Sequence, residues 1–201
     1  MLTAAAATEK GIHLRNQDAY LCLPGRGLFA VADGVTTGGR SERASKAAID
    51  AVRNSKELAA AFAKAHARIR QLKDAGSTTL TACTIRGTRL EFVHVGDSAL
   101  LLVRDRVLQL TREHAQPGSN LLTQVVGKGG IRPQQGAATL RKGDILLLLT
   151  DGVTKHLDEE ELLALARTLR VQLLPKALLA RARTKPKLYE DDKTAVAVRI
   201  G

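Results

Sequence analysis

Residues 145–152 read ILLLLTDG, an aliphatic run that ends in a threonine and an Asp-Gly pair. A continuous aliphatic run of this length is typical of a β-strand buried on both faces, which must lie between two layers. Residues 27–34, GLFAVADG, repeat the arrangement of an apolar run followed by Asp-Gly. The sequence therefore predicts two interior strands, each with an aspartate at its end.

Other strands surround these two along the chain. Apolar or alternating patterns predict them at residues 2–8, 19–23, 78–85, 90–95, 99–103, 107–110 and 194–200. The connections at 86–88 and 104–106 are short and polar. Such connections favour antiparallel pairing, in hairpins or in a meander.

Helical patterns occur in two blocks. Apolar residues recur at helical spacing within residues 41–73, which we interpret as two helices, the second capped by Ser55. The same spacing predicts helices at 158–169 and 173–183, whereas 121–126 fits either a helix or a loop. Because strands and helices do not alternate strictly, the pattern indicates an α+β fold with helices packed on largely antiparallel sheets.

The composition is that of one globular domain spanning residues 1–201. The hydrophobic fraction is 44% and the charged fraction 25%, which argues against a disordered chain. Aromatic residues make up only 2%, which argues against single-stranded nucleic-acid binding by base stacking. The longest aliphatic run is too short to span a bilayer, and the first residues do not resemble a signal peptide. We therefore expect a cytoplasmic protein with no membrane span.

The chain is strongly basic, with 31 Lys and Arg against 20 Asp and Glu and a formal net charge of +11. Such a surface favours acidic partners or polyanions, but it is also compatible with a solvated surface that has no specific role. Nucleic acid is not expected as a partner, because no nucleic-acid motif accompanies the charge. The two cysteines, Cys22 and Cys83, do not predict a disulfide framework.

Aspartates cluster at predicted strand ends. Asp33 and Asp151 each follow an apolar run and precede a glycine, Asp97 follows HVG, Asp191 precedes the last strand, and Asp18 precedes residues 19–23. A carboxylate at the end of a buried strand is costly unless it is paired or binds a cation. Several of them in one place would make an oxygen cage suited to Mg²⁺ or Mn²⁺. The alternative is that each Asp-Gly pair only marks a turn.

Seven motifs that contain these aspartates resemble a known family when taken in order. They are RNQDA, VADG, STT, HVGDS, LTQVVG, LLTDGVT and DDKTAVAV. They look like the metal-dependent protein serine/threonine phosphatases of type 2C, the PPM family, in its compact bacterial form. The resemblance runs from residue 11 to residue 200. It implies a four-layer α-β-β-α sandwich of two largely antiparallel β-sheets flanked by helices, and a centre of two Mn²⁺ or Mg²⁺ ions with a possible third.

The resemblance also implies roles for single residues. Asp33 would bridge the two metal ions, and the Gly34 carbonyl would bind one of them. Asp151 and Asp191 would bind the other ion, and Asp18 would act through metal-bound water. These four aspartates are the expected catalytic residues.

Two further acidic positions extend this set. Asp97 matches a residue that helps hold a third metal ion together with the Asp151 equivalent. Asp192 is the alternative to Asp191 if the motif is aligned one residue away.

The sequence departs from the family pattern in three places. His13 stands where the family has an arginine that binds the substrate phosphate. Arg15 faces the same way if the chain is extended there, so either residue is a candidate for phosphate binding, and Arg15 could equally be a solvated surface charge. Val35 and residues 36–39 differ from the family's glycine-rich loop. The segment 115–120 predicts a shortened flap.

The implied activity is hydrolysis of phosphoserine and phosphothreonine through a metal-activated bridging water. Implied partners are phosphoproteins, including a cognate serine/threonine kinase or its substrates, and we expect a monomer. The alternative is a catalytically weak, phosphatase-like regulatory or binding protein, which the histidine at position 13 and the altered loop favour.

Overall fold

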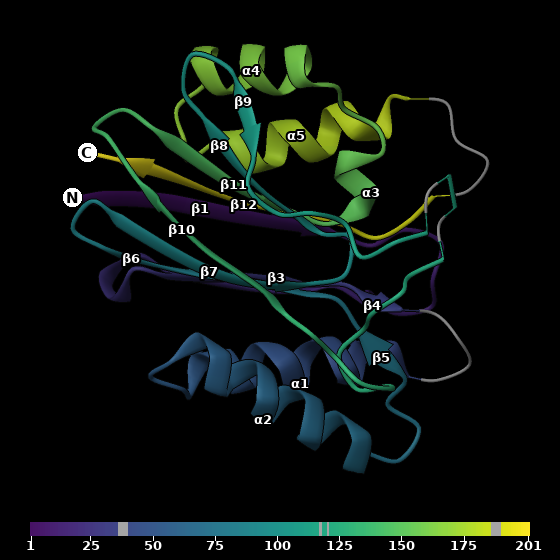
Figure 1. The fold of residues 1–201 in the computed structure, drawn as a ribbon. Coiled ribbons are helices and arrows are strands. Elements are labelled where there is room, and N and C mark those ends of the chain that lie inside the picture. Colours follow the sequence, from purple (N-terminus) through teal and green to yellow (C-terminus); the bar gives the residue numbers. More distant parts are fainter. Residues whose placement is uncertain (36–39, 117, 120, 186–189) are drawn as a thin grey trace.

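Two antiparallel sheets form the interior of the computed structural model, which describes residues 1–35, 40–116, 118–119, 121–185 and 190–201 (Figure 1). The first sheet has the strand order β1-β12-β11-β8-β9. Its strands are β1 (Leu2–Glu9), β12 (Lys193–Ile200), β11 (Ile145–Leu149), β8 (Ala99–Val103) and β9 (Val107–Gln109). The second sheet has the order β10-β7-β6-β3-β2. Its strands are β10 (Gln134–Thr139), β7 (Arg89–Val95), β6 (Leu80–Arg86), β3 (Leu28–Ala32) and β2 (Ala19–Leu23). A short pair, β4 (Gly34–Val35) and β5 (Ser77–Thr78), stands apart from both sheets.

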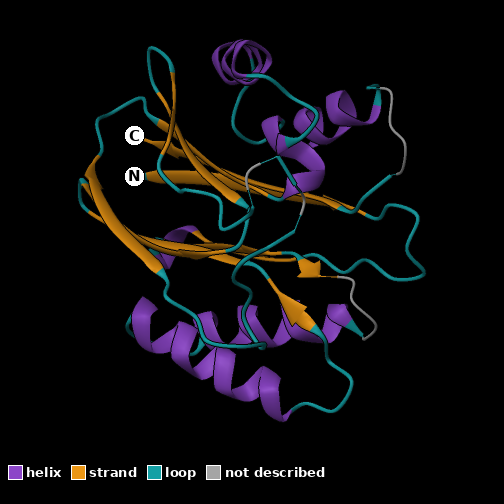
Figure 2. Ribbon diagram, turned by 45° about the vertical axis from the view of Figure 1, so that its right-hand side comes forward, coloured by secondary structure: helices purple, strands orange, loops and turns teal. Residues whose placement is uncertain are grey.

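Helices cover the outer face of each sheet (Figure 2). On the second sheet lie α1 (Ser41–Arg53) and α2 (Leu58–Gln71). On the first sheet lie α3 (Asp151–Thr154), α4 (Glu159–Thr168) and α5 (Leu174–Arg183). A short 3-10 turn, η1 (Pro24–Arg26), joins β2 to β3 in the second sheet. The predicted four-layer sandwich is confirmed.

The interior strands explain why their sequences are continuously apolar. All five residues of β11 are buried. Leu147 and Leu149 pack against the helices of their own sheet, whereas Leu146 and Leu148 pack against the facing sheet. Because both faces of the strand are covered, an alternating polar pattern would place polar side chains in the core.

The chain crosses from one sheet to the other after β7. The connection 86–88 makes the expected hairpin between β6 and β7, and 104–106 makes the one between β8 and β9. Strands β7 and β8 lie in different sheets, so the strands do not continue as one meander. A hydrogen bond of 2.8 Å between the Thr79 and Ser98 hydroxyls links this crossing to the residue before β6.

Two local expectations are corrected by the structure. Ser55 does not cap the second helix, which begins at Leu58 after Glu57 and has no side-chain cap. The segment 121–126, open between helix and loop, is a loop held by isolated bridges. By contrast, Asp158 caps α4 in a reciprocal capping box with Glu161.

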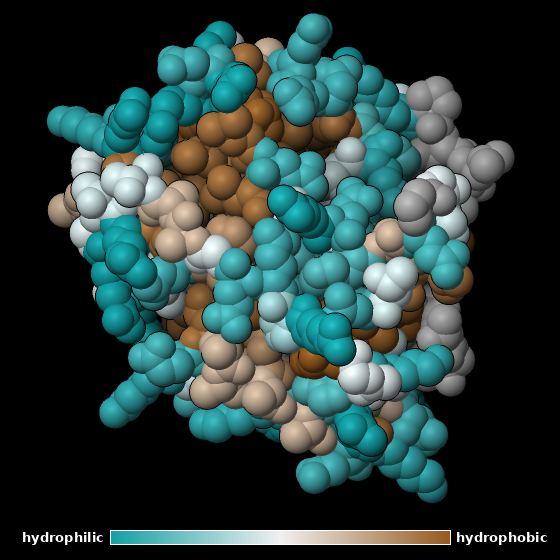
Figure 3. Space-filling view, viewed as in Figure 1, coloured by the Kyte–Doolittle hydropathy of each residue, from teal (hydrophilic) through white to brown (hydrophobic). Residues whose placement is uncertain are grey.

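Figure 3 shows hydrophilic side chains over most of one face and a group of apolar side chains in its upper half. Among the helices that the structure describes, none is long and apolar enough to cross a membrane.

Candidate metal centre

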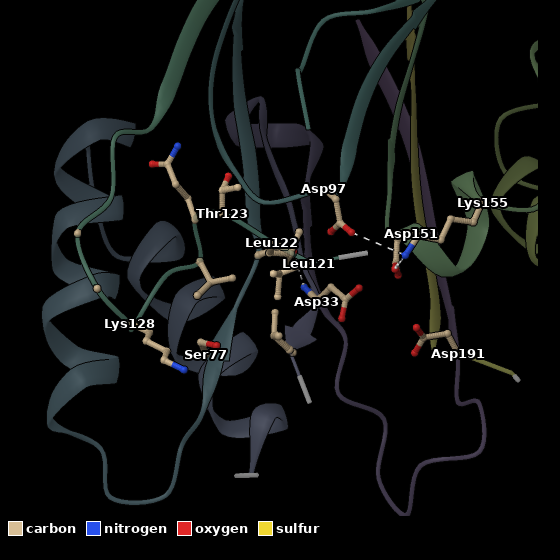
Figure 4. A pocket seen from close by; sticks show the side chains of 17 residues that line it. Asp33, Ser77, Asp97, Leu121, Leu122, Thr123, Lys128, Asp151, Lys155 and Asp191 are labelled. Atoms are coloured by element: carbon tan, nitrogen blue, oxygen red, sulfur yellow. Dashed lines mark hydrogen bonds and ion pairs between the residues drawn. The ribbon is translucent and has the colours of Figure 1, made fainter. Parts of the chain in front are cut away.

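The predicted aspartates meet at one end of the sandwich. Asp33 follows β3, Asp151 follows β11, Asp191 comes just before β12, and Asp97 lies in the crossing between the sheets. All four line a single pocket of about 600 Å³, with Gly34 beside them. Figure 4 shows their carboxylates directed toward a common space. The strand ends of both sheets therefore supply one acidic centre.

Asp18 lies beside this pocket rather than in its wall, and it is only 5% exposed. Its Oδ2 accepts a hydrogen bond of 2.9 Å from the Thr150 hydroxyl, next to Asp151 in the chain. The structure thus brings all five predicted aspartates and Gly34 to one region.

Hydrogen bonds with the segment 78–79 hold the backbone of Asp33 in place. Its carbonyl accepts from the Thr79 amide at 2.8 Å and from the Thr78 hydroxyl at 2.7 Å. Its own amide donates to the Thr79 hydroxyl at 2.9 Å. The STT motif, residues 77–79, therefore fixes the position of the Asp33 backbone.

Two glycines allow the segment that carries Asp191 to lie close to other segments of the same chain. A Cβ on Gly152 would lie 2.0 Å from the Asp192 carbonyl oxygen, and one on Gly11 would lie 2.3 Å from the Glu190 carbonyl oxygen. The backbone at 190–192 is thus packed between these two glycines. This explains physically why an Asp-Gly pair follows β11: the glycine leaves room for the second acidic segment.

Burial and mutual repulsion shift the titration of the carboxyl groups. Burial, followed by the negative charges of Asp151 and Asp18, raises the pKa of Asp33 well above its usual range. Burial raises the pKa of Asp18 to about 8, although hydrogen bonds from Thr194 and Thr150 oppose this. Burial and the charge of Asp151 raise the pKa of Asp97 to about 6. The protein part of this centre alone therefore disfavours full ionisation of its carboxylates.

Two carboxylate oxygens show that the centre suits a cation. Asp18 Oδ1 and Asp151 Oδ1 are buried and have no hydrogen-bond partner among the described residues. Buried carboxylate oxygens without donors are costly, and a hard divalent cation with oxygen preference would satisfy them. The donor set, carboxylates with a nearby backbone carbonyl, fits Mn²⁺ or Mg²⁺ better than Zn²⁺.

Asp191 and Asp192, adjacent in the chain just before β12, make different contacts. Asp191 lines the pocket, with its side chain 25% exposed. The oxygens of Asp192 accept hydrogen bonds from the Gly11 amide at 2.6 Å and the Gln17 amide at 2.7 Å, so this residue fastens the loop that precedes β2. The geometry favours Asp191 over Asp192 as the residue facing the centre.

His13 and Arg15 do not lie together. The chain bends at 12–15 rather than running extended. His13 Nδ1 is 3.3 Å from Asp192 Oδ2 and 3.9 Å from Asp191 Oδ1, and these three side chains are near enough to share a cation. Arg15 is largely exposed and pairs with Glu42 of α1 at 3.3 Å. The role of either in phosphate binding stays a prediction.

The altered loop and the flap are described only in part. Val35 lines the pocket, whereas residues 36–39 lie outside the described residues. A bridge between Ala115 and Leu122 closes the segment expected to be a short flap, of which residues 117 and 120 are also outside the description. The chain that follows, residues 121–125, forms a wall of the pocket.

Lys155 is a charged residue of the centre that the sequence reasoning missed. Its Nζ lies 2.5 Å from Asp151 Oδ2 and 3.8 Å from Asp97 Oδ2. Burial opposes its charge, but the charges of Asp151 and Asp97 raise the pKa of Lys155 above its usual value. The available signal was its spacing: four residues after Asp151, one helical turn brings the two side chains together.

Comparison with known proteins agrees with this geometry. Residues 24–201 match the family described as stage II sporulation protein E (SpoIIE). Protein phosphatase PhpP of Streptococcus pneumoniae is 32% identical over 105 residues, 42% of this chain and 43% of PhpP. Serine/threonine protein phosphatase PstP of Mycobacterium tuberculosis is 28% identical over 199 residues, 81% of this chain and 38% of PstP. The chain thus spans about two fifths of the length of these curated relatives.

Solved structures share the fold along the whole chain. The catalytic domain of PstP in complex with two manganese ions superposes with a TM-score of 0.85 and 25% identity, covering 100% of this chain and 99% of that domain. PppA, a regulatory component of the type VI secretion system in Pseudomonas aeruginosa, superposes with a TM-score of 0.89 and 24% identity, covering 98% and 97%. This chain belongs to the stage II sporulation protein E (SpoIIE) family and has the fold of the PPM phosphatases.

Proposed function

We propose that this chain is a metal-dependent protein serine/threonine phosphatase. The observation that carries the proposal is the buried acidic centre, in which Asp18 Oδ1 and Asp151 Oδ1 have no hydrogen-bond donor among the described residues. Relatives of this chain are named protein phosphatases, and the PstP catalytic domain holds two manganese ions, which supports the same activity here.

Asp33, Asp151 and Asp191 would hold two Mn²⁺ or Mg²⁺ ions. Gly34 would offer its carbonyl oxygen as a further ligand, and Asp18, beside the pocket, would act through metal-bound water. When bound, such ions activate a water for attack on phosphorus and neutralise charge on the phosphoryl oxygens. The protein supplies carboxylates in fixed positions, because strand ends and the hydrogen bonds to Asp33 leave them little freedom. This pre-organisation is what a transition state with developing charge requires.

The cysteines offer no competing nucleophile. Cys83 is fully buried between the sheets, and burial raises the pKa of its thiol to about 12. Burial also raises the pKa of Cys22, which lies on β2 away from the pocket lining. A reactive cysteine needs a depressed pKa, so these residues do not favour a cysteinyl-phosphate mechanism.

The substrate class we propose is phosphoserine and phosphothreonine in proteins. The pocket is an open groove between the acidic centre and the wall at 121–125, and Lys128 adds a positive charge at its far side (Figure 4). An open groove admits a side chain carried on a polypeptide. The physiological partners we propose are phosphoproteins of a kinase pathway, met by a monomer in the cytoplasm.

A catalytically weak regulatory protein is the second candidate. The ion pair of Lys155 with Asp151 favours it, because the ammonium competes with a metal ion for one of the expected ligands.

The test is phosphate release from a phosphothreonine peptide with Mn²⁺, with Mg²⁺ and with EDTA, for the wild type and for Asp33→Asn and Asp151→Asn. Asp105→Asn, in the exposed turn between β8 and β9, is the matched control. We expect metal-dependent release that both centre variants lose by at least about 100-fold and the control keeps. Full activity in both centre variants would refute the proposal. Mn²⁺ binding by calorimetry without release would leave the second candidate.

A further inference from the structure

The side of the centre that carries Asp97 differs from the side that carries Asp18. Asp97 and Asp151 have side chains that are each 10% exposed, and both face the Nζ of Lys155. At 2.5 Å and 3.8 Å from one oxygen of each, the ammonium lies between the two carboxylates (Figure 4). On the Asp18 side, the described structure places no such cation against Asp18 Oδ1.

An ammonium and a divalent ion cannot both occupy the space between Asp97 and Asp151. Both bind the same carboxylate oxygens, and like charges a few ångströms apart repel strongly in a partly buried site. The Lys155 side chain is tethered to the chain, so its local concentration exceeds that of any free ion. A protein cation already in this position therefore competes with a metal ion for it.

We propose that the ammonium of Lys155 takes the place of a third metal ion between Asp97 and Asp151, so that the centre of this chain holds two ions. The inference rests on the proposed metal-dependent function and assigns one half of the centre to metal and the other half to the protein's own cation. Lys155 is a positioning residue here: it acts through Asp97 and Asp151.

The geometry of α3 is what makes this arrangement possible. Asp151 begins that helix and Lys155 follows its last residue, so one turn carries the ammonium back over the carboxylate. The side chain is 43% exposed, which leaves its stem free to withdraw if the charge is removed or outcompeted. Substitution at this position therefore alters the charge with little expected cost to packing.

The test counts bound ions by Mn²⁺ calorimetry, with electron paramagnetic resonance of free Mn²⁺ as an independent count. We expect two ions per wild-type chain and three per chain for Lys155→Met. Lys155→Arg, which keeps the charge, should bind two. The double variant Lys155→Met with Asp97→Asn should return from three to two, because the new site loses a ligand.

Lys128→Met is the matched control, since Lys128 lines the same pocket on its far side. It should bind two ions. A third ion in the wild type, or only two ions in Lys155→Met with an unchanged melting temperature, would overturn the inference while leaving the proposed function intact. Failure of every variant and the wild type to bind Mn²⁺ would overturn both.

Discussion

Replacing Gly152 with alanine should displace the acidic segment on which the centre depends. A Cβ at this position would lie 2.0 Å from the Asp192 carbonyl oxygen and 3.0 Å from its carbon, whereas real Cβ contacts stay above 3.0 Å. The backbone must therefore separate by about 1 Å. The opposing atom is main chain, so no side-chain rotation can relieve the contact.

The magnitude follows from that displacement. Overpacking a well-packed site costs about 1–3 kcal/mol, which for a domain of this size lowers the melting temperature by roughly 2–12 °C. Because Asp191 precedes Asp192 directly, the same shift moves a proposed metal ligand. Disturbing the support of a ligand typically lowers metal affinity by about 10–100-fold.

Thermal unfolding followed by circular dichroism, with and without Mn²⁺, measures the first effect, and calorimetric titration with Mn²⁺ measures the second. Gly25→Ala is the matched control, because a Cβ there meets nothing within 4 Å. It should leave both quantities unchanged within error. Wild-type stability and Mn²⁺ affinity in Gly152→Ala would refute the close approach of the two segments.

Three further outcomes are expected. Asp192→Ala removes the acceptor for two amides of the loop 11–17, so it should cost about 1–3 kcal/mol and speed hydrogen exchange in that loop; unchanged protection would contradict this role. Asp158→Ala should cost about 1 kcal/mol in urea unfolding, whereas Ser55→Ala should be neutral, and equal losses would show that the capping assignment is wrong. Burial raises the pKa of Asp18 from 3.8 to about 8 in the folded chain, so its ionisation destabilises the metal-free fold: in EDTA, the contribution of Asp18 to stability, measured against Asp18→Asn, should be fully present near pH 4 and be lost as pH rises through 8. Over that window Mn²⁺ affinity should rise by up to about tenfold per pH unit for each proton released, and a flat profile would contradict the shift.

The interior strands could be predicted from the sequence because burial on both faces requires apolar residues throughout. Strands such as β3 and β11 are covered on both faces, so every residue must be apolar, and the sequence shows it directly. The edge strand β10 reads QQGAAT and alternates between half-buried and exposed positions. Its small and polar residues carry no such signal, and pairing with β7 rather than local preference makes it a strand.

The local error at Ser55 has a different origin. Serine has a strong preference for the helix N-cap, but the helix begins only where its apolar face reaches the sheet, at Leu58. Tertiary packing decided the boundary and overrode a preference worth about 1 kcal/mol. Asp158, in contrast, combines the cap with a glutamate three residues on, and this reciprocal pattern predicts a boundary better than one residue does.

The residues of the acidic centre could be predicted as a group, but the separate role of each residue could not. Asp191 and Asp192 are adjacent aspartates just before β12, and only the fold shows that Asp191 lines the pocket while Asp192 accepts hydrogen bonds from the loop that precedes β2. Lys155 was overlooked because a lysine after an apolar strand and a short turn has many surface uses. Its contacts with Asp97 and Asp151 depend on the crossing after β7, which carries Asp97 and which local patterns do not encode.

The charge pattern of the centre itself argues for where metal binds. Five carboxylates gathered at the ends of two apolar sheets repel one another, and burial prevents water from screening them. Within the described part of the chain, the ammonium of Lys155 pairs with Asp97 and Asp151. The charge that stays uncompensated lies toward Asp18 and Asp33, where a donorless oxygen also remains. Divalent ions should therefore bind first on that side, and their binding, rather than the basic surface of the chain, is what stabilises the ionised centre at neutral pH.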